Sequence, residues 1–455
     1  MADLARDPAR PSEDTKGTAV QGAEGAVVQG RWRQLSLLGG TMLIDSAESG
    51  LITGLFPVIR QSLGLSLGAL GVLGAAGKLI GVVTAPLWIW AAHRWSRKGI
   101  LIIATSLWGV WGVAAGFAQN FTQLLVLTTV LAAGYAAAQP LVTEIVGDLF
   151  DSRSRGRAVG LLYGAVALTS ALLAALKGQL AGFEDGWRWG LCTIGGFNML
   201  FGLLLWRYLR DPGQGAAEPQ LADLDPKARR ATAKVTRTQI ADLLKIRTFR
   251  ILLASRLLSG HMVASAFSVV FLVDVYGFTT QTASAILLPL GIGFFAGTLL
   301  GGLAADWAAT RSPRHGLPAV LQAAQIAFAV AAYFGTQFDY GSLALFALFF
   351  ALMGIAQGVN PGINRPMVMA VTPPELRGAA FTVYVSIVEA VAWAVFSLGA
   401  GYLGDIIGLR AVFLWLLVIL MLVNGAFLTL LYRPYADDVR RAQEELDRRR
   451  ATALS

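Results

Sequence analysis

The sequence predicts an all-α polytopic membrane protein with twelve transmembrane helices, arranged as two pseudo-symmetric six-helix bundles. Three observations lead to this fold class. Long apolar stretches recur in two groups of six, and a polar linker separates the groups. Only 14% of the residues are charged, against roughly a quarter in soluble domains. The positive charges gather in alternate loops, which is typical of a chain that crosses a membrane repeatedly.

Each apolar stretch is long enough to cross a bilayer, which takes about 20 residues. The stretch Gly99–Ala118, for example, contains no charged residue. Together the stretches use almost the whole chain, so no segment remains for a soluble catalytic domain. The expected spans are 34–60, 67–92, 99–118, 122–147, 157–181, 188–208, 249–275, 282–306, 316–335, 342–371, 378–404 and 409–432.

The regions outside the spans complete a division of the chain into five parts. The polar N-terminal region lacks an apolar core, so it is not expected to be a cleaved signal peptide. Within the linker, Thr238–Arg250 has apolar residues near helical spacing, which indicates a short amphipathic helix on the membrane surface. The five parts are a disordered cytoplasmic tail (1–32), an N-terminal bundle (33–209), a cytoplasmic linker with the amphipathic helix (210–248), a C-terminal bundle (249–432) and a cytoplasmic C-terminal tail (433–455).

The basic residues predict the orientation in the membrane. They cluster after spans 2, 4 and 8, in the linker and at the C-terminal end, whereas the opposite loops carry mainly acidic residues. By the positive-inside rule both termini and the linker lie in the cytoplasm, and the chain is a multi-pass protein of an inner or plasma membrane. The net charge of +9 therefore reflects this loop asymmetry, and no nucleic-acid partner is expected. The single cysteine, Cys192, excludes an internal disulfide and a cysteine-based metal site.

The two halves of the chain resemble each other. After span 4 the sequence reads Arg155-Gly156-Arg157-Ala158, and after span 10 it reads Arg377-Gly378-Ala379-Ala380. Short basic turns also follow spans 2 and 8. These matching turns indicate a duplicated six-span unit, with the copies related by an axis along the membrane normal.

With these features the chain resembles a transporter of the major facilitator superfamily, over nearly its whole length. The family's loop after span 2 usually reads Gly-x-x-x-Asp-Arg-x-Gly-Arg-Arg. Here Ile89, His93 and Ser96 replace the first glycine, the aspartate and the second glycine, whereas the bases are kept. The resemblance implies a latch on the cytoplasmic side, in which Asp148 could pair with Arg94 or Arg97. The residues assigned to gating are Arg94, Arg97, Asp148, Arg155, Asp306, Arg311 and Arg377.

The position of the chain within the family is indicated by two turns and by span 5. Span 5 lacks the proline of the drug-antiporter pattern, since it reads Tyr163-Gly164-Ala165-Val166-Ala167-Leu168. The turn Leu149–Gly160 and the run Pro373–Gly378 look more like the Spinster-like and organic-anion branches. The Spinster pattern often has Asp-Arg in span 1, where this chain has Asp45-Ser46.

Charged residues inside spans usually face a cavity or a partner. In the family fold, spans 1, 4, 7 and 10 line the central cavity, and spans 3, 6, 9 and 12, which here have no ionisable residue in their cores, face lipid. Asp45 and Glu48 are three residues apart and share a helix face. We expect this carboxylate pair to be the proton-coupling centre; the alternative is a fixed ion pair with Lys78 or Arg365. The full set assigned to coupling is Asp45, Glu48, Glu144 and Glu389.

Arg365 lies in a proline-containing part of span 10, Asn360–Pro366. Two prolines there predict an interrupted helix, which is tolerated at membrane depth where it lines a cavity. Arg365 is expected to hold an anionic head group; the alternative is a pairing with Glu144 or Asp148. His261 either titrates in the cavity or is a packing histidine. The residues assigned to substrate binding are Lys78, Tyr135, Gln139, His261, Gln357, Asn360, Asn364, Arg365, Tyr384 and Trp393.

These residues predict a secondary active transporter that moves a small amphipathic or organic-anion substrate by alternating access, coupled to protons. Efflux of hydrophobic or multiple drug-like compounds by proton antiport is one alternative. A lipid scramblase or a substrate sensor on the same scaffold is another, since His93 stands where the latch acid is expected. The sequence has no P-loop, metal-ligand cluster or nucleophile–base pattern, so neither an enzyme nor a cofactor is expected. The expected partners are the small-molecule substrate, protons and the lipid bilayer, and the expected state is a monomer.

Overall fold

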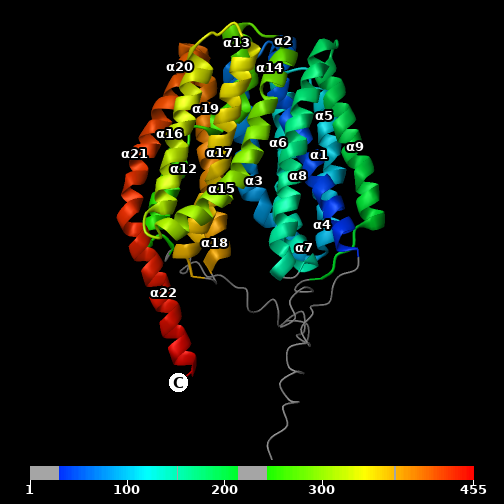
Figure 1. Cartoon of the computed structure of the whole chain (residues 1–455). Helices are drawn as coiled ribbons and strands as arrows, with labels where there is room; N and C mark the ends of the chain where they lie inside the picture. The colour runs from blue at the N-terminus through cyan, green and yellow to red at the C-terminus, as the bar shows by residue number, and fades with distance from the viewer. Residues whose placement is uncertain (1–29, 151, 214–242, 374–375, 455) are drawn as a thin grey trace, which may run out of the picture.

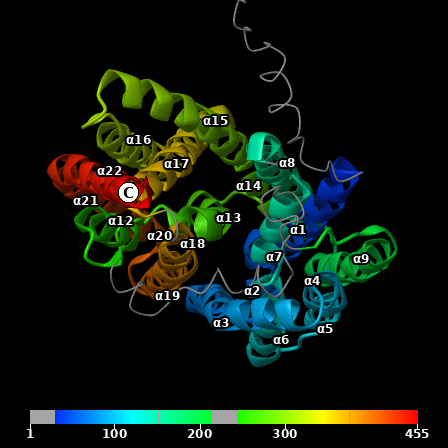
Figure 2. The ribbon, with the colours of Figure 1, turned by 90° about the horizontal axis from the view of Figure 1, so that it is seen from below.

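A computed structural model describes residues 30–150, 152–213, 243–373 and 376–454, with the backbone alone for 152–157, 378–379 and a few residues near the C-terminal end. The described chain forms two helical bundles that lie side by side (Figures 1 and 2). The N-terminal tail and most of the linker, with residues 238–242 of its expected amphipathic helix, lie outside the described residues.

The first bundle extends from residue 31 to residue 208. A π-helical segment, Ile102–Ser106, and a short 3-10 turn, Leu107–Gly109, join two of its helices into one span. Its α-helices are α1 (Arg31–Gly54), α2 (Phe56–Leu63), α3 (Leu67–Arg94), α4 (Arg97–Leu101), α5 (Val110–Gly116), α6 (Phe121–Tyr135), α7 (Ala138–Leu149), α8 (Ser152–Gly178) and α9 (Gly186–Tyr208).

The second bundle begins at residue 247 and continues into a long C-terminal helix. π-helical segments at Thr382–Glu389 and Leu414–Ile419 interrupt its last two spans. Its α-helices are α12 (Arg247–Leu257), α13 (Met262–Tyr276), α14 (Thr280–Ile286), α15 (Leu288–Arg311), α16 (Gly316–Gln337), α17 (Leu343–Val371), α18 (Arg377–Phe381), α19 (Ala390–Ile407), α20 (Leu409–Phe413), α21 (Leu420–Phe427) and α22 (Tyr432–Leu454).

The predicted set of spans is confirmed. Among the described residues, 11 helices are long and apolar enough to cross a membrane, and α1 with α2 makes a twelfth span that is bent by 55°. The bend falls at Leu55, just before Pro57 in the first turn of α2. A proline there lacks the backbone N–H that would continue the hydrogen bonding of α1, so a new helix begins in a new direction.

The predicted interruption of span 10 is wrong. Helix α17 runs without a break from Leu343 to Val371 and contains both Pro361 and Pro366. The reason is close packing against α15, because Gly354 and Gly358 lie directly on the α15 backbone. A neighbouring helix at this distance holds the chain helical where a proline removes a hydrogen bond.

The hydrophobic core is continuous between the bundles at only one end of the molecule. There, buried residues of both bundles form a single cluster that includes Leu55, Phe56, Phe267 and Phe271. At the opposite end each bundle has a separate core, one around Leu141 and the other packed behind α17. We call the first the far end (top of Figure 1) and the second the linker end, where α9 ends and α12 begins. The bundles are therefore joined at the far end and separate at the linker end.

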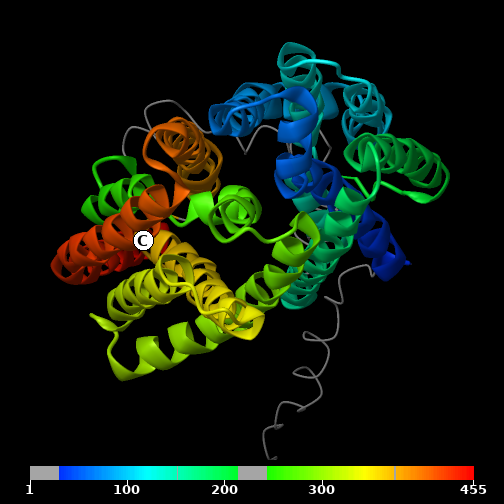
Figure 3. The same cartoon turned by 90° about the horizontal axis from the view of Figure 1, so that it is seen from above.

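Helices α3 and α19 form the most extensive contact between the bundles (Figures 2 and 3). Gly71 faces the backbone oxygen of Ser397, and Gly401 faces that of Leu67, so closely that a side chain at either glycine would clash. Small residues at such a crossing allow two backbones to approach. This contact holds the far end shut.

Two polar contacts between the bundles also lie at the far end. The Asp405 carboxylate accepts hydrogen bonds from the backbone N–H groups of Leu67 and Gly68, at 2.9 and 2.7 Å. Asp405 of α19 therefore caps the N-terminus of α3, where a negative charge is favourable. In addition, Arg60 Nη1 lies 2.5 Å from Asp274 Oδ2.

The C-terminal helix α22 continues from the last span and projects beyond the linker end (Figure 1). Its first turns pack on the second bundle. There the buried Asp438 carboxylate accepts a hydrogen bond of 2.8 Å from the backbone N–H of Thr248. This contact ties the C-terminal helix to the start of α12.

Candidate functional site

A cavity of about 1060 Å³ lies between the two bundles. The first bundle contributes wall residues from α1, α3, α6, α7 and α8. The second contributes wall residues from α13, α17, α18, the π-helical segment Thr382–Glu389 and α19. The continuous core at the far end closes it on that side, whereas the bundles are separate at the linker end. The cavity is therefore open toward the linker end.

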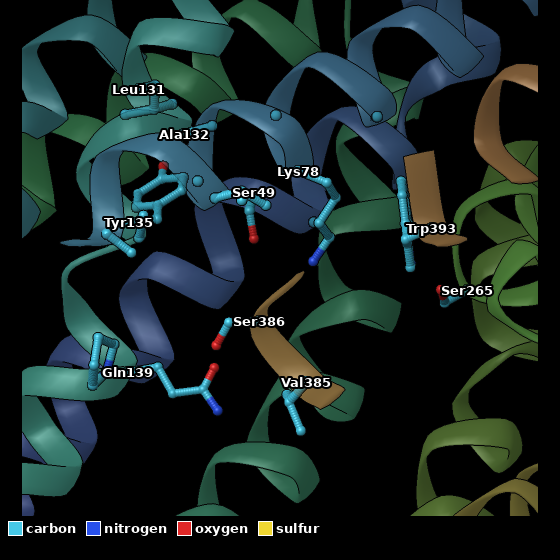
Figure 4. Close-up of a pocket in the computed structure, with 18 of the residues that line it drawn as sticks. Ser49, Lys78, Leu131, Ala132, Tyr135, Gln139, Ser265, Val385, Ser386 and Trp393 are labelled. Atoms are coloured by element: carbon cyan, nitrogen blue, oxygen red, sulfur yellow. The ribbon is translucent and has the colours of Figure 1, made fainter. Parts of the chain in front are cut away.

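Two basic side chains, one from each bundle, face this cavity. Lys78 extends from α3 toward Trp393 of α19, with its Nζ 5.2 Å from the centre of the Trp393 ring (Figure 4). Arg365 comes from α17, and both basic side chains are exposed within the cavity wall. Among the described residues neither has a carboxylate within 4.0 Å, so neither forms the ion pair expected as an alternative.

The rest of the wall is partly polar and partly apolar. The hydroxyl groups of Thr143 and Tyr163 form a hydrogen bond of 2.8 Å beside the cavity. Gln139 of the first bundle and Ser386 of the second point into the space between the bundles (Figure 4). Apolar surface comes from Trp393 and from aliphatic side chains. Such a wall suits a molecule with an anionic group and an apolar body.

Asp45 and Glu48 of α1 lie together in the first bundle, and of the two Glu48 belongs to the wall of the central cavity. Both residues are buried: Asp45 is 6% exposed and Glu48 is 0% exposed. Glu48 occupies a niche beside α5, because a Cβ atom at Gly112 would lie only 1.7 Å from Glu48 Oε1. The amide nitrogen of Asn198 in α9 donates to Glu48 Oε2 at 3.1 Å and lies 3.4 Å from Asp45 Oδ1.

The remaining oxygens of this carboxylate pair have no partner among the described residues. Asp45 Oδ2 and Glu48 Oε1 are buried without a hydrogen bond in the described part of the chain. The buried hydroxyl of Tyr135 lies beside Glu48. No ion pair is formed by either acid in the described part of the chain. Two uncompensated charges in such a place are costly, so the arrangement favours at least one bound proton.

The carboxylate pair has access to the cavity. Glu48 and Tyr135 belong to the cavity wall. A smaller cavity of about 150 Å³ extends from Gln139 to Asp45, past Ser46 and Ser49. The acid pair is therefore connected to the central cavity.

The other two acids assigned to coupling have basic partners. Glu144 of α7 accepts a hydrogen bond of 3.0 Å from Arg97 and lies 3.0 Å from His93 Nε2. Glu389 lies 2.5 Å from the Nη2 atom of Arg256. By its position in the sequence Arg256 lies near the end of a span, but here its guanidinium contacts Glu389 inside the second bundle. These partners compensate the charges of Glu144 and Glu389.

Several residues assigned to substrate binding lie outside the cavity wall in this conformation. Tyr384 is buried beneath the Arg256 guanidinium, 5.8 Å from it. His261 is buried with its ring edge against Phe328, as a packing histidine would be. Gln357, Asn360 and Asn364 lie on α17, where Asn360 accepts a hydrogen bond from Gln325. By contrast, the assigned residues in the wall are Lys78, Tyr135, Gln139, Arg365 and Trp393.

Of the residues assigned to gating, Arg97 is buried at the linker end. Its guanidinium binds Glu144, Asp148 and Asp211, at 2.5 Å for Asp148 Oδ2. Arg94 and Arg97 were the two expected partners of Asp148, and in the structure Asp148 pairs with Arg97. All three acids belong to the first bundle or to the start of the linker, so this cluster does not join the bundles here. Arg94, Asp306, Arg311 and Arg377 are exposed, and the side chain of Arg155 lies outside the described residues.

Sequence reasoning missed Asn198, Gly112, Asp405 and Asp211. Asn198 is the lone side-chain amide in α9, and a lone amide in an apolar span is a signal that a search for ionisable residues overlooks. Asp405 precedes a loop and reads as a surface acid. Only the three-dimensional structure shows which backbone groups its carboxylate meets.

The fold and the cavity define a class of protein: a polytopic helical membrane protein in which two bundles share a central polar cavity open at one end. The sequence profile described as Major Facilitator Superfamily matches residues 37–315 and 312–454. The chain belongs to this superfamily.

Among curated proteins, the chain is similar to a probable 4-methylmuconolactone transporter of Cupriavidus pinatubonensis, with 30% identity over 32% of this chain and 35% of that protein. It is 28% identical to the 3-(3-hydroxy-phenyl)propionate transporter of Escherichia coli over 58% of this chain and 61% of that protein. It is also 24% identical to the protein spinster of Drosophila melanogaster, over 42% of this chain and 32% of that protein. The matched part thus spans between one third and about three fifths of these relatives.

Among solved structures, the fold is similar to that of a bacterial homologue of the human lysosomal transporter Spinster in an inward-facing, unoccupied conformation. The TM-score is 0.73 at 20% identity, over 91% of this chain and 98% of that one. A D-xylose–proton symporter gives a TM-score of 0.69 at 15% identity, over 89% of this chain and 98% of that one. These similarities support the fold.

Proposed function

We propose that this protein is a secondary active transporter that moves a small organic anion with an apolar or aromatic body across an inner or plasma membrane. It works by alternating access and is coupled to protons. In the proposed orientation the linker end and both termini face the cytoplasm, as the positive-inside bias of the loops indicates.

One observation carries the substrate class: Lys78 and Arg365 come from different bundles, face one cavity and lack a carboxylate partner among the described residues. Closing the linker end would bring these two positive charges together. An anion bound between Lys78 and Arg365 would offset the repulsion between their charges, and its binding would therefore favour closure of the linker end. Substrate binding and the change of access are linked in this way.

The adjoining Trp393 supplies an aromatic face at the same place, next to the Lys78 ammonium group. A ring stacked there with its carboxylate on Lys78 or Arg365 matches the form of hydroxyphenylpropionate, which names one of the relatives. Aromatic and other hydrophobic carboxylates are therefore the proposed substrate class.

The coupling centre is proposed to be Asp45 and Glu48, because Glu144 and Glu389 have basic partners and these two do not. A proton on this pair removes a buried charge, and its release restores the charge. The free energies of the protonated and the ionised pair differ most when the pair is shielded from water, so protonation favours one access state over the other.

The test is uptake of radiolabelled carboxylates, including 3-(3-hydroxyphenyl)propionate, into proteoliposomes with and without an imposed pH gradient. A cationic dye and a fluorescent lipid serve as further probes. We expect carboxylate uptake that depends on the gradient and is lost in Lys78→Gln and Arg365→Gln. Lys98→Gln is the matched control, because Lys98 donates to the backbone oxygen of Trp206 away from the cavity.

Two results would contradict the proposal. Transport of the dye but not of any carboxylate would point to drug efflux, and gradient-independent lipid movement would point to a scramblase. Asp45→Asn and Glu48→Gln are expected to abolish uptake driven by the pH gradient while exchange of carboxylate at equal pH continues. Normal gradient-driven uptake in both variants would remove the coupling role.

A further inference from the structure

Asn198 lies fully buried in the first bundle, on a helix that contributes no side chain to the wall of the central cavity. It comes from α9, the sixth span, and its Cβ atom packs near Gly109 at the start of α5. Its amide reaches across to α1. An amide buried among apolar spans requires partners, because an unpaired polar group there costs free energy.

The partners of Asn198 are the two carboxylates of α1. One amide nitrogen with two hydrogens donates to Glu48 Oε2 at 3.1 Å and approaches Asp45 Oδ1 at 3.4 Å. Both acids are thereby held by the same neutral group. Each also keeps one oxygen with no partner among the described residues.

The other groups around the pair carry no compensating charge. Helix α6 contributes the buried hydroxyl of Tyr135, and α5 contributes Gly112, which has no side chain. Lys177 lies on α8, which packs against α1, and its Nζ donates to the backbone oxygen of Ala47 at 3.0 Å. Among the described residues it forms no ion pair with either acid.

We propose that Asn198 is a positioning residue for proton coupling, which holds Asp45 and Glu48 in one geometry whether or not they carry a proton. This inference rests on the proposed function of the acid pair. A neutral amide can donate to a carboxylate and also to the carbonyl oxygen of a carboxylic acid. An arginine or lysine in its place would instead hold the acids ionised, and an apolar side chain would let them turn away.

The second bundle contains a matched residue for comparison. Asn424 is also fully buried and lies in α21, the corresponding last span of its bundle. Its Oδ1 accepts a hydrogen bond of 2.7 Å from the hydroxyl of Ser255. Asn424 is therefore a buried amide of the same kind that binds a serine rather than two acids.

The experiment compares Asn198→Leu with Asn424→Leu in the full-length protein in proteoliposomes. The first readout needs no substrate: the infrared C=O band of protonated carboxylic acids is recorded across a pH titration. The second is uptake of 3-(3-hydroxyphenyl)propionate as a function of pH, beside its exchange at equal pH. Leucine is close to asparagine in size, and loss of a hydrogen bond to a charged group corresponds to a shift of about one pH unit or more.

For Asn198→Leu we expect the carboxyl band and the pH midpoint to move by about one unit, whereas exchange at equal pH is kept. For Asn424→Leu we expect neither to move. Identical titrations of the band in wild type and Asn198→Leu would overturn the inference. If Asn198→Leu does not fold, Asn198→Ala takes its place, since alanine removes the amide donor without adding volume or a new carboxyl group; an unmoved carboxyl band in Asn198→Ala would also overturn the inference.

Failure of the proposed function gives a different result. In that case Asp45→Asn and Glu48→Gln leave gradient-driven uptake intact, whatever Asn198→Leu does. If those two variants abolish coupling and Asn198→Leu leaves the titration unchanged, the acids act without positioning by Asn198, and only the present inference is lost.

Discussion

Replacement of Asp405 by alanine is expected to open the far end of the protein. Asp405 lies on α19 of the second bundle and caps α3 of the first, through hydrogen bonds of 2.9 and 2.7 Å to two backbone N–H groups. These bonds exist only while the far end is closed, because the donor and the acceptor belong to different bundles. Their loss therefore destabilises the closed far end selectively.

The expected magnitude follows from the geometry of the cap. A side chain at an N-cap contributes about 0.5–2 kcal/mol, and the negative charge near the helix dipole about 0.3–1 kcal/mol. By comparison, Arg60 and Asp274 are each about a third exposed, and such a pair contributes about 0–1 kcal/mol. Asp405 is thus the stronger polar link. Loss of about 1–2 kcal/mol changes the ratio of the two access states by about 5- to 30-fold.

The assay measures the distance across the far end by double electron–electron resonance. Spin labels are placed on Gln61 and Thr279, which are exposed and belong to different bundles, in a background in which Cys192 is replaced by alanine. We expect Asp405→Ala to increase the long-distance population. Asp405→Asn keeps one acceptor oxygen without the charge, so its effect is expected to be intermediate.

Asp339→Ala is the matched control, because Asp339 lies in a far-end loop and, among the described residues, accepts a hydrogen bond only from the nearby Gly341 N–H. Its distance distribution is expected to equal that of the parent. If Asp405→Ala gives the same distribution as Asp339→Ala, the cap contributes nothing to closure and the reasoning is refuted.

Three further predictions follow from named contacts. Gly112→Ala is expected to displace the Glu48 carboxylate, since its Cβ would lie 1.7 Å from Oε1. Gradient-driven uptake should then be lost and exchange kept, whereas Gly196→Ala, with open space around its Cβ, should behave as wild type. Glu389→Gln leaves the Arg256 charge without its partner and is expected to lower thermal stability by about 1–3 kcal/mol; Arg256→Gln in the same chain should restore part of it, and an unchanged melting temperature would count against the pair. Arg97→Gln removes the only cation that the described residues place against Asp148 and Asp211. We expect it to lower stability and to release the start of the linker to proteases, and protease resistance equal to wild type would speak against this role.

Composition and hydropathy were sufficient for the architecture of this protein. A bilayer removes water from the backbone, so long apolar stretches can only be helices, and their number and the loop charges predict the topology. The helix ends and the interior of α17 were less predictable. Pro57 bends its span, but Pro361 and Pro366 do not interrupt theirs, because the outcome depends on how closely the neighbouring helix packs.

The sequence by itself also placed Asp45, Glu48, Lys78 and Arg365 inside spans, because an ionisable residue stands out against apolar neighbours. It did not determine which of them are paired. That depends on which helices of a bundle touch, so only the tertiary structure separated Glu144 and Glu389, which have basic partners, from Asp45 and Glu48, which share Asn198. The far-end cap could not be predicted from the sequence either. Asp405 and the N-terminus of α3 are 338 residues apart in the sequence and meet only when the two bundles close on each other.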